Sequence, residues 1–398
     1  MALVTVMNRT TPIFEVELDE SGRLLDIGNV LDEKLMPVCL QGSGSFSRDT
    51  VSKWMTDRLI PDKKRIGYED VRRAFQVTSN RHNMFSLSDQ YWFRWSQRET
   101  WGHGNFFTNP YETDWGRMFF SPWTVNPDNL RKESPDMTTN GVLKKRWVRN
   151  DDTGVSVLIK AGSREAHQDP LCEVLSSMTL AQLSIIPFVQ YELCVDGLTF
   201  CCRCENFVTA KTEFVPAGHV YHRERRNKET DTPYRHLVKM TKKYAPGIQD
   251  PEYYYQRMMV ADACTGNTDR NLSNFGFIRS AETGEIIDFA PLFDMGSALF
   301  DEGGTKKARL FSEEDTGEAI KQISKNFGQR IVKQLKERDL LDVVDTYPML
   351  MESEKKKIAK KIGDNYNKIR KTIGDMISYK RIDPNTTPQI EIEYETVH

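Results

Sequence analysis

Long apolar runs are missing from this sequence. No stretch of eighteen apolar residues occurs, so we expect no transmembrane helix and no membrane partner. The first twenty residues lack a charged start followed by a long apolar run, so we expect no secretory signal. The formal net charge is only −2, from 55 Lys and Arg against 57 Asp and Glu. This balance excludes a globally basic coat for nucleic acid.

Cysteine is scarce, and the seven cysteines are an odd number for a chain of 398 residues. This pattern is typical of free thiols in a reducing compartment, so we expect a cytoplasmic protein. Cys201, Cys202 and Cys204 are close enough in sequence to suggest a zinc site. No second Cys or His pair follows at zinc-like spacing, since the next histidines are His219 and His222. We therefore favour a buried strand for this segment over a zinc site.

Tryptophan is absent from every residue after Trp147, and all seven tryptophans lie between Trp54 and Trp147. The first third of the chain is therefore expected to pack a core of a different kind from the rest. Aromatic residues interleaved with arginine can stack on nucleic-acid bases. Here the acids Asp89, Glu112 and Asp114 flank them. We favour simple packing, and we expect no direct contact with nucleic acid.

The remaining sequence alternates strand and helix patterns, which indicates an α+β fold with two or three domains or lobes. Residues 155–162 read as a strand, followed by a helix with Asp169 as its cap and Pro170 at its first position. Asp196-Gly197 between two strand-like runs predicts a tight hairpin. Helical spacing of apolar residues predicts three further helical segments, at 251–267, 316–341 and 352–377.

Two further segments have a composition that could bind phosphate. The glycine-rich run at 42–46 lies more than a hundred residues before Lys160, so we interpret it as a flexible turn. Residues 355–381 hold ten Lys or Arg and two acids. We favour a solvated helix face there over a phosphate-binding face.

Three polar side chains at defined spacing suggest phosphoryl transfer. Asn274 follows Asp269 by five residues, and Asp294 follows after twenty more. Phosphoryl transfer needs a carboxylate that orients the attacking hydroxyl and oxygen ligands for Mg²⁺. The intervening residues read as strand, turn at Thr283-Gly284 and strand, which would return Asp294 to the side of Asn274. Asp294-Met295-Gly296 then occupies the D-x-G position of kinases.

A lysine and a glutamate precede these residues in the order that a kinase requires. Lys160 lies near the end of the 155–162 strand, and Glu173 lies on the helix that follows. Taken singly, Lys160 reads as a surface lysine, Glu173 as a solvated helix position, and the Asp and Asn residues as loop formers. As an ordered set they favour a nucleotide site.

Residues 267–275 (NTDRNLSNF) and 290–294 (APLFD) resemble the HipA-like kinases, bacterial Ser/Thr protein kinases distantly similar to phosphatidylinositol kinases. The resemblance covers residues from about 138 to 335. It implies an α+β, two-lobed protein-kinase-like fold with a mixed N-terminal lobe containing an antiparallel sheet and a mainly helical C-terminal lobe. We expect a Trp-rich extension of the N-lobe, the N-lobe core, a helical C-lobe with the catalytic loop and a flexible tail, at 1–137, 138–208, 209–383 and 384–398.

The same resemblance implies ATP and Mg²⁺ as cofactors and a role for each site residue. Asp269 would be the catalytic base, and Asn274 and Asp294 would complete the catalytic set as metal ligands. Lys160 would bind ATP phosphates and pair with Glu173. The hinge that touches adenine would fall at 204–207, which includes Glu205 and Phe207.

This chain departs from the family pattern in two places. Many members carry His after the Asp-Arg pair, where this chain has Asn271. The loop over the phosphates would be 138–144, which keeps Gly141 and Lys144 but has no glycine series. Thr138 or Thr139 in that loop is a candidate for autophosphorylation.

The sequence leaves the substrate and partners open. The leading hypothesis is an ATP- and Mg²⁺-dependent Ser/Thr protein kinase with an unidentified protein substrate. The alternatives are a lipid or small-molecule kinase, or a non-catalytic nucleotide-binding partner in a toxin–antitoxin complex. In the last case an antitoxin or another DNA-binding partner protein would read the DNA. Residues 221–243 and 301–318 are each interpreted equally well as substrate-handling segments and as solvated loops; the second holds Thr305, Ser312 and Thr316 as candidate phosphate acceptors.

Overall fold

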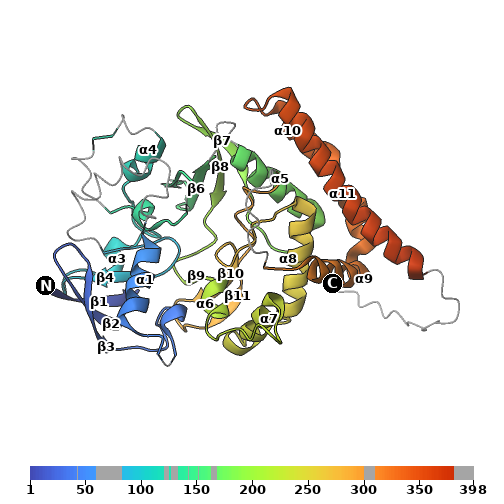
Figure 1. Cartoon of the computed structure of the whole chain (residues 1–398). Coiled ribbons are helices and arrows are strands. Elements are labelled where there is room, and N and C mark those ends of the chain that lie inside the picture. The colour runs from blue at the N-terminus through green and yellow to red at the C-terminus, as the bar shows by residue number, and fades with distance from the viewer. Residues whose placement is uncertain are drawn as a thin grey trace, which may run out of the picture.

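The computed structural model describes residues 1–42, 44–59, 83–120, 125–126, 133–141, 143–150, 152–162, 168–299 and 310–380. Three antiparallel sheets and a set of helices make up these residues (Figure 1). The expected α+β fold is confirmed. The predicted flexible tail at 384–398 lies outside the described residues. No described helix is both long and apolar enough to cross a bilayer.

The first sheet belongs to the Trp-rich third of the chain, drawn in blue in Figure 1. Its strand order is β3-β2-β1-β4, and helix α1 packs on it. Trp54 of α1 lies against Phe14 and Phe93 in a core separate from that of the C-terminal helices. A cavity of about 230 Å³ opens beside α1, and none of the predicted site residues lines it. The elements of this third are β1 (Ala2–Asn8), β2 (Thr11–Leu18), β3 (Leu24–Val30), η1 (Val38–Leu40), α1 (Arg48–Arg58), β4 (Tyr91–Arg94), α3 (Trp101–Gly104), α4 (Asp114–Phe120) and η4 (Pro135–Thr138).

The second sheet has the order β5-β6-β8-β7, and α5 packs against it. The predicted strand, helix and hairpin are all present. The turn lies one residue later than predicted, because Asp196 pairs with Thr199 and leaves Gly197-Leu198 as the two-residue turn. Gly197 takes a φ of 61°, which glycine adopts at little cost. The elements are β5 (Lys145–Arg149), β6 (Ser156–Ala161), α5 (Gln168–Leu183), β7 (Glu192–Asp196) and β8 (Thr199–Glu205).

The third sheet, β11-β10-β9, contains the hairpin expected between Asn274 and Asp294. Helix α8 precedes it and ends where glycine was expected to end it, at Gly266 with a φ of 69°. Around these elements lie β9 (Thr212–Pro216), α6 (Ala217–Tyr221), α7 (Pro233–Tyr244), α8 (Pro251–Thr265), β10 (Gly276–Ser280) and β11 (Ile286–Phe289).

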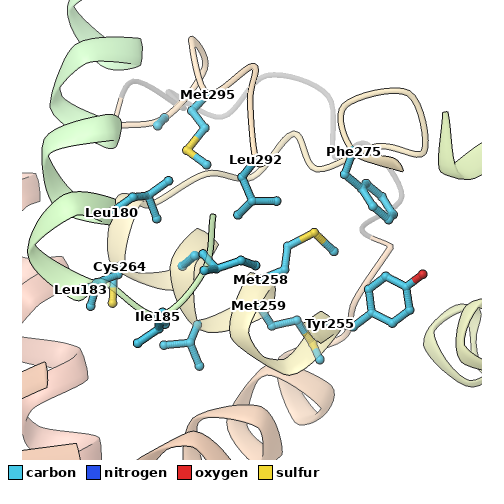
Figure 2. Close-up of a cluster of buried hydrophobic side chains, with 14 of the residues drawn as sticks. Leu180, Leu183, Ile185, Tyr255, Met258, Met259, Cys264, Phe275, Leu292 and Met295 are labelled. Atoms are coloured by element: carbon cyan, nitrogen blue, oxygen red, sulfur yellow. The ribbon is translucent and has the colours of Figure 1, made fainter. Parts of the chain in front are cut away.

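An apolar core joins α5, α8 and the loops that flank the β10–β11 hairpin. Figure 2 shows Leu180 and Leu183 of α5 facing Met258 and Met259 of α8, with Leu292 beside them. All five side chains are buried. Burial of such side chains contributes about 1.5–3 kcal/mol each, so this core holds α8 and the segment that follows the β10–β11 hairpin against α5.

The C-terminal helices correct one prediction. A single helical segment was expected at 316–341, but α9 (Glu313–Gln334) and α10 (Glu337–Thr346) are separated by an extended backbone at Leu335 and Lys336. The buried Leu335 turns the chain back, and its carbonyl accepts a hydrogen bond of 2.6 Å from Arg370. Arg370 lies on α11 (Glu352–Lys380). The isoleucine stripe predicted on α11 is buried at four described positions, Ile358, Ile362, Ile369 and Ile373.

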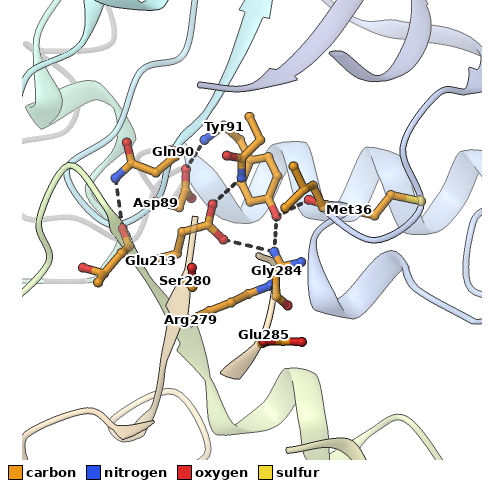
Figure 3. Close-up of polar contacts among 12 residues, drawn as sticks. Met36, Asp89, Gln90, Tyr91, Glu213, Arg279, Ser280, Gly284 and Glu285 are labelled. Carbon is orange, nitrogen blue, oxygen red and sulfur yellow. Dashed lines mark hydrogen bonds and ion pairs between the residues drawn. The ribbon is translucent and has the colours of Figure 1, made fainter. Parts of the chain in front are cut away.

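A buried arginine attaches the first sheet to the third. Arg279 of β10 donates to Glu213 of β9 at 3.1 Å and to the hydroxyl of Tyr91 on β4 at 2.6 Å (Figure 3). It also donates to the carbonyls of Lys34 and Gly284, each at 2.8 Å. Burial raises the pKa of Glu213 to about 7, against the attraction of Arg279. Loss of the guanidinium would therefore leave a buried carboxyl without its counter-charge.

We predict that Arg279→Met lowers the free energy of unfolding by about 3–5 kcal/mol, the cost of removing one partner from a buried ion pair. Arg203→Met is the matched control, because Arg203 and Glu192 form an exposed pair. An exposed pair contributes about 0–1 kcal/mol. Urea unfolding followed by circular dichroism measures both variants. Equal losses would contradict the role given to Arg279.

Candidate active site

Lys160, Glu173 and Asp294 meet at one point between the second sheet and the segment after β11. The Lys160 ammonium on β6 contacts the carboxylate of Glu173 on α5, and it lies 2.7 Å from Asp294 Oδ1. The side chains of Lys160 and Glu173 are 5% and 2% exposed, and that of Asp294 is 38% exposed. Asp294 thus presents an open side of the carboxylate while the lysine–glutamate pair stays buried.

The Asp294 segment is held in an uncommon backbone conformation. Asp294 has a φ of 61°, in the left-handed region. The next backbone amide, of Met295, donates to Glu173 Oε2 at 2.8 Å. Phe293, on the other side, packs its ring against Phe207 and Phe214 at centroid distances of 5.7 and 5.3 Å. Glu173 therefore positions both Lys160 and the D-x-G segment.

The charges at this point favour an ionised Asp294. Burial alone would raise the pKa of Asp294, but Lys160, Lys145 and Arg270 outweigh burial and lower it to about 2. Burial lowers the pKa of Lys160, yet Asp294 and Glu173 hold it well above the usual value. Burial raises the pKa of Glu173 despite the attraction of Lys160. Near neutral pH, Lys160 is therefore a cation beside an anionic Asp294.

A second buried arginine organises the loop that contains Asp269. Arg270 Nη2 lies 2.8 Å from Asp262 Oδ1 on α8, and both side chains are nearly inaccessible. Arg270 Nη1 donates to the carbonyl of Asn274 at 2.6 Å and to that of Phe293 at 3.0 Å. Arg270 therefore ties the Asp269–Asn274 loop to the residue before Asp294.

Asp269 and Asn274 lie in this loop as a half-buried pair. The amide of Asp269 donates to Asn267 Oδ1 at 3.2 Å. Asn274 Nδ2 donates to the carbonyl of Asp269 at 3.2 Å, so the amide oxygen of Asn274 points the other way. This oxygen and the carboxylate of Asp294 are the hard oxygen donors that Mg²⁺ prefers. The chemistry of these two donors suits Mg²⁺, and their role as metal ligands stays a prediction.

The predicted hinge lies beside this site. The backbone amide of Asn206 donates to the carbonyl of Ser156 at 2.9 Å, which holds the end of β8 against β6. Glu205 is exposed, and Phe207 packs on Phe293. The segment therefore runs from the end of the sheet to the edge of the Asp294 segment, and its role as a hinge stays a prediction.

The lysine that faces the site from β5 is Lys145. It lies directly opposite Lys160 in the β5–β6 register, so both side chains share one face of the sheet. Lys144 is the residue before β5, so the strand register does not place its side chain. Gly141 has a φ of 106°, and a Cβ there would overlap Lys145 Nζ. Gly141 thus leaves space for Lys145, and a role for Lys144 stays a prediction.

Both threonines proposed for autophosphorylation are buried. The Thr138 hydroxyl donates to the carbonyl of Phe85 at 2.8 Å, and the Thr139 hydroxyl donates to that of Pro135 at 2.6 Å. Phosphate transfer to either hydroxyl would require this turn to open. Of the later candidates, Ser312 caps α9 through Asp315, Thr316 donates to the Ser312 carbonyl, and Thr305 lies outside the described residues.

Sequence analysis missed two residues that the site depends on. Asp262 reads as an ordinary position in the apolar part of α8, and its partner follows only eight residues later, beyond the helix end. Lys145 follows another lysine, and only the strand register distinguishes the two. Only a prediction that the strand begins at Lys145 could have distinguished the two lysines from the sequence.

A buried lysine–glutamate pair that closes on a D-x-G carboxylate is the arrangement of protein-kinase-like folds. No model of a known protein family matches this chain, and no curated protein matches it in sequence. HipA of Shewanella oneidensis MR-1, solved in complex with HipB and its operator DNA, is similar in fold over 96% of this chain and 100% of its own, with a TM-score of 0.54 and 12% identity. This similarity confirms the expected HipA-like kinase fold. The Helicobacter pylori proinflammatory kinase CtkA matches 59% of this chain and 95% of its own, with a TM-score of 0.47 and 16% identity.

We predict that Arg270→Met lowers the free energy of unfolding by about 3–5 kcal/mol, because Asp262 is left buried and unpaired. The double variant Asp262→Leu/Arg270→Met removes both charges and should recover at least half of that loss. Hydrogen exchange of residues 269–275 should be faster in both variants, since both lose the bonds to the carbonyls of Asn274 and Phe293. Recovery of slow exchange in the double variant would contradict the positioning role of Arg270.

Proposed function

We propose that this chain is an ATP- and Mg²⁺-dependent Ser/Thr protein kinase. The observation that carries the proposal is the contact of one buried ammonium, that of Lys160, with both Glu173 and Asp294. Kinases require the lysine–glutamate pair and the D-x-G carboxylate to be in place together. The HipA-like kinase fold supports the proposal.

Each side chain has a chemical role in this proposal. Asp269 accepts the proton of the substrate hydroxyl as the base of the catalytic loop. Asn274 and Asp294 hold Mg²⁺, which neutralises charge on the phosphates when bound. Lys160 binds the phosphates, and Glu173 keeps its ammonium oriented.

A second lysine and two hinge residues complete the nucleotide site in this proposal. Lys145 adds a second positive charge on the Lys160 face, above Gly141. The hinge at 204–207 lies where adenine would stack against Phe207. Glu205 borders the same edge and is exposed.

The partner is a protein of unidentified sequence in this proposal. HipA from Shewanella was solved with HipB and operator DNA, so an antitoxin-like, DNA-binding partner is a reasonable extension to this chain. The near-zero net charge of this chain suits indirect association with DNA through such a partner.

Asp269→Asn should abolish phosphoryl transfer, by at least about 10²-fold, because the base is lost while the fold is retained. Asp288→Asn is the matched control: it makes the same change at an exposed acid on β11. Intact mass and radiolabel transfer after incubation with ATP and Mg²⁺ measure activity, with casein and myelin basic protein as added substrates. Full activity of Asp269→Asn would refute the assignment.

If the wild type shows no phosphoryl transfer, a nucleotide-binding measurement decides whether the nucleotide site is retained. Mg²⁺-dependent binding of a fluorescent ATP analogue that is lost in Asp294→Asn would retain the nucleotide site and reject the catalytic proposal for these substrates. Absence of binding by the wild type would reject the nucleotide site as well.

Lys145→Met should weaken ATP binding by about 10-fold or more, the effect of losing one charge-assisted hydrogen bond of about 1.5–3 kcal/mol. Lys144→Met, the same change one residue earlier and outside β5, should change it less than about twofold. Isothermal titration with ATP and Mg²⁺ compares the two. A larger effect at Lys144 would restore the original expectation for that residue and reject the one for Lys145.

A further inference from the structure

Two cysteines lie directly opposite each other in the β7–β8 hairpin. Cys194 of β7 pairs with Cys201 of β8 in the antiparallel register. Residues opposite each other in such a pair have Cα atoms about 4.5–5.5 Å apart. A disulfide spans Cα distances of about 4.4–6.8 Å. The hairpin therefore holds the two thiols in bonding range without movement of either strand.

The strand register separates this pair from the neighbouring cysteines. Cys202 lies opposite Lys160, and Cys201 lies opposite Ala161. Alternation along the strand therefore places Cys202 and Cys204 on the inner face with Lys160, and Cys201 on the other face with Cys194. The sequence cluster that suggested zinc is thus divided between two faces, and the described residues hold no group of three or more His, Cys, Asp or Glu side chains that could bind a metal.

The surroundings of the pair favour a reactive thiolate at Cys194. Cys194 is half-buried, whereas Cys201 is fully buried. The Cys201 thiol donates to the carbonyl of Thr199 at 3.4 Å. The neighbouring Cys201 lowers the pKa of Cys194 against the effect of burial, and Arg203 lowers it further. Cys194 and burial raise the pKa of Cys201. Cys194 therefore has the character of the attacking thiol, and Cys201 that of the resolving thiol.

Other cysteines lack this combination. Cys39 is also half-buried, but burial raises its pKa to about 12. Cys264 is buried, and burial raises its pKa to about 12 as well. Neither has a cysteine opposite it in a described strand pair.

We propose that Cys194 and Cys201 form a reversible intramolecular disulfide when the protein meets a hydroperoxide. The Cys194 thiolate attacks one oxygen of hydrogen peroxide, the O–O bond breaks and a sulfenic acid forms. The displaced hydroxide takes up the proton that the Cys194 thiol released and leaves as one water. The Cys201 thiol then attacks the Cys194 sulfur, loses its proton, and displaces hydroxide as a second water. The two thiols lose two electrons, and the peroxide gains them. Dithiothreitol reverses the reaction.

The bond would cross-link β7 to the strand that pairs with β6. Cys201 adjoins Cys202, whose cross-strand partner is Lys160. The modification site therefore lies on the reverse face of the sheet that contains the proposed nucleotide lysine. It is independent of the proposed kinase activity, and its test needs no catalytic assay.

The experiment is a thiol count and an intact mass of the full chain before and after treatment with hydrogen peroxide. In denaturant, free thiols should fall by two from the seven of the sequence, and the mass should fall by about 2 Da. Endoproteinase Asp-N, which cleaves before Asp196, should leave the two flanking peptides joined until dithiothreitol is added. Non-reducing electrophoresis should show a monomer.

Variants decide which cysteines react. Cys194→Ser should retain all six remaining thiols under the same dose. Cys201→Ala should lose one thiol and gain one oxygen, because Cys194 still reaches the sulfenic acid and no thiol resolves it. Cys202→Ala, adjacent on the other face, and Cys39→Ser should still lose two. If the buried Cys201→Ala does not fold, the half-buried Cys194→Ser decides alone. The proposal would be overturned if Cys194→Ser lost two thiols. It would also be overturned if the wild type kept seven thiols, gained oxygen without the mass loss, or formed a covalent dimer.

Discussion

The burial of one ammonium group determines how the elements around the candidate site are arranged. Lys160 is almost inaccessible, and a buried charge is tolerated only with a counter-charge and hydrogen bonds. Its two carboxylates come from separate elements, Glu173 from α5 and Asp294 from the segment after β11. Because both must reach the same nitrogen, α5 and the segment after β11 are each fixed in position relative to Lys160 on the second sheet.

Two buried guanidinium groups extend the same constraint to the rest of the chain. Arg270 joins α8 to the loop with Asp269 and to the carbonyl before Asp294. Arg279 joins the first sheet to the third through Glu213 and Tyr91. The apolar cores provide cohesion, which is non-directional, whereas these hydrogen bonds have fixed geometry. The cores therefore hold the elements together, and the three cations determine how the elements are oriented.

Local sequence signals predicted most of the elements but not their long-range pairs. Gly266 ended α8 as expected, because a glycine in the left-handed region ends a helix whatever the remaining fold. The break at Leu335 was missed, since it depends on Arg370, which lies far along the chain. Asp262 was missed for the same reason. Lys160 and Asp294 were predicted as a set by their order along the chain, whereas the choice between neighbouring lysines depends on a strand register that the sequence does not display.

Asp294 shows how such a site is maintained at some cost to stability. Its φ of 61° is left-handed, which for a residue with a side chain costs on the order of 1 kcal/mol. In this conformation the Met295 amide donates a hydrogen bond to Glu173, which, as a bond to a charged group, contributes about 1.5–3 kcal/mol. A glycine at position 294 would remove the strain, but it would also remove the carboxylate that neutralises Lys160. The same glutamate therefore stabilises the buried lysine and the strained backbone, so the open carboxylate of Asp294 depends on the integrity of the whole buried pair.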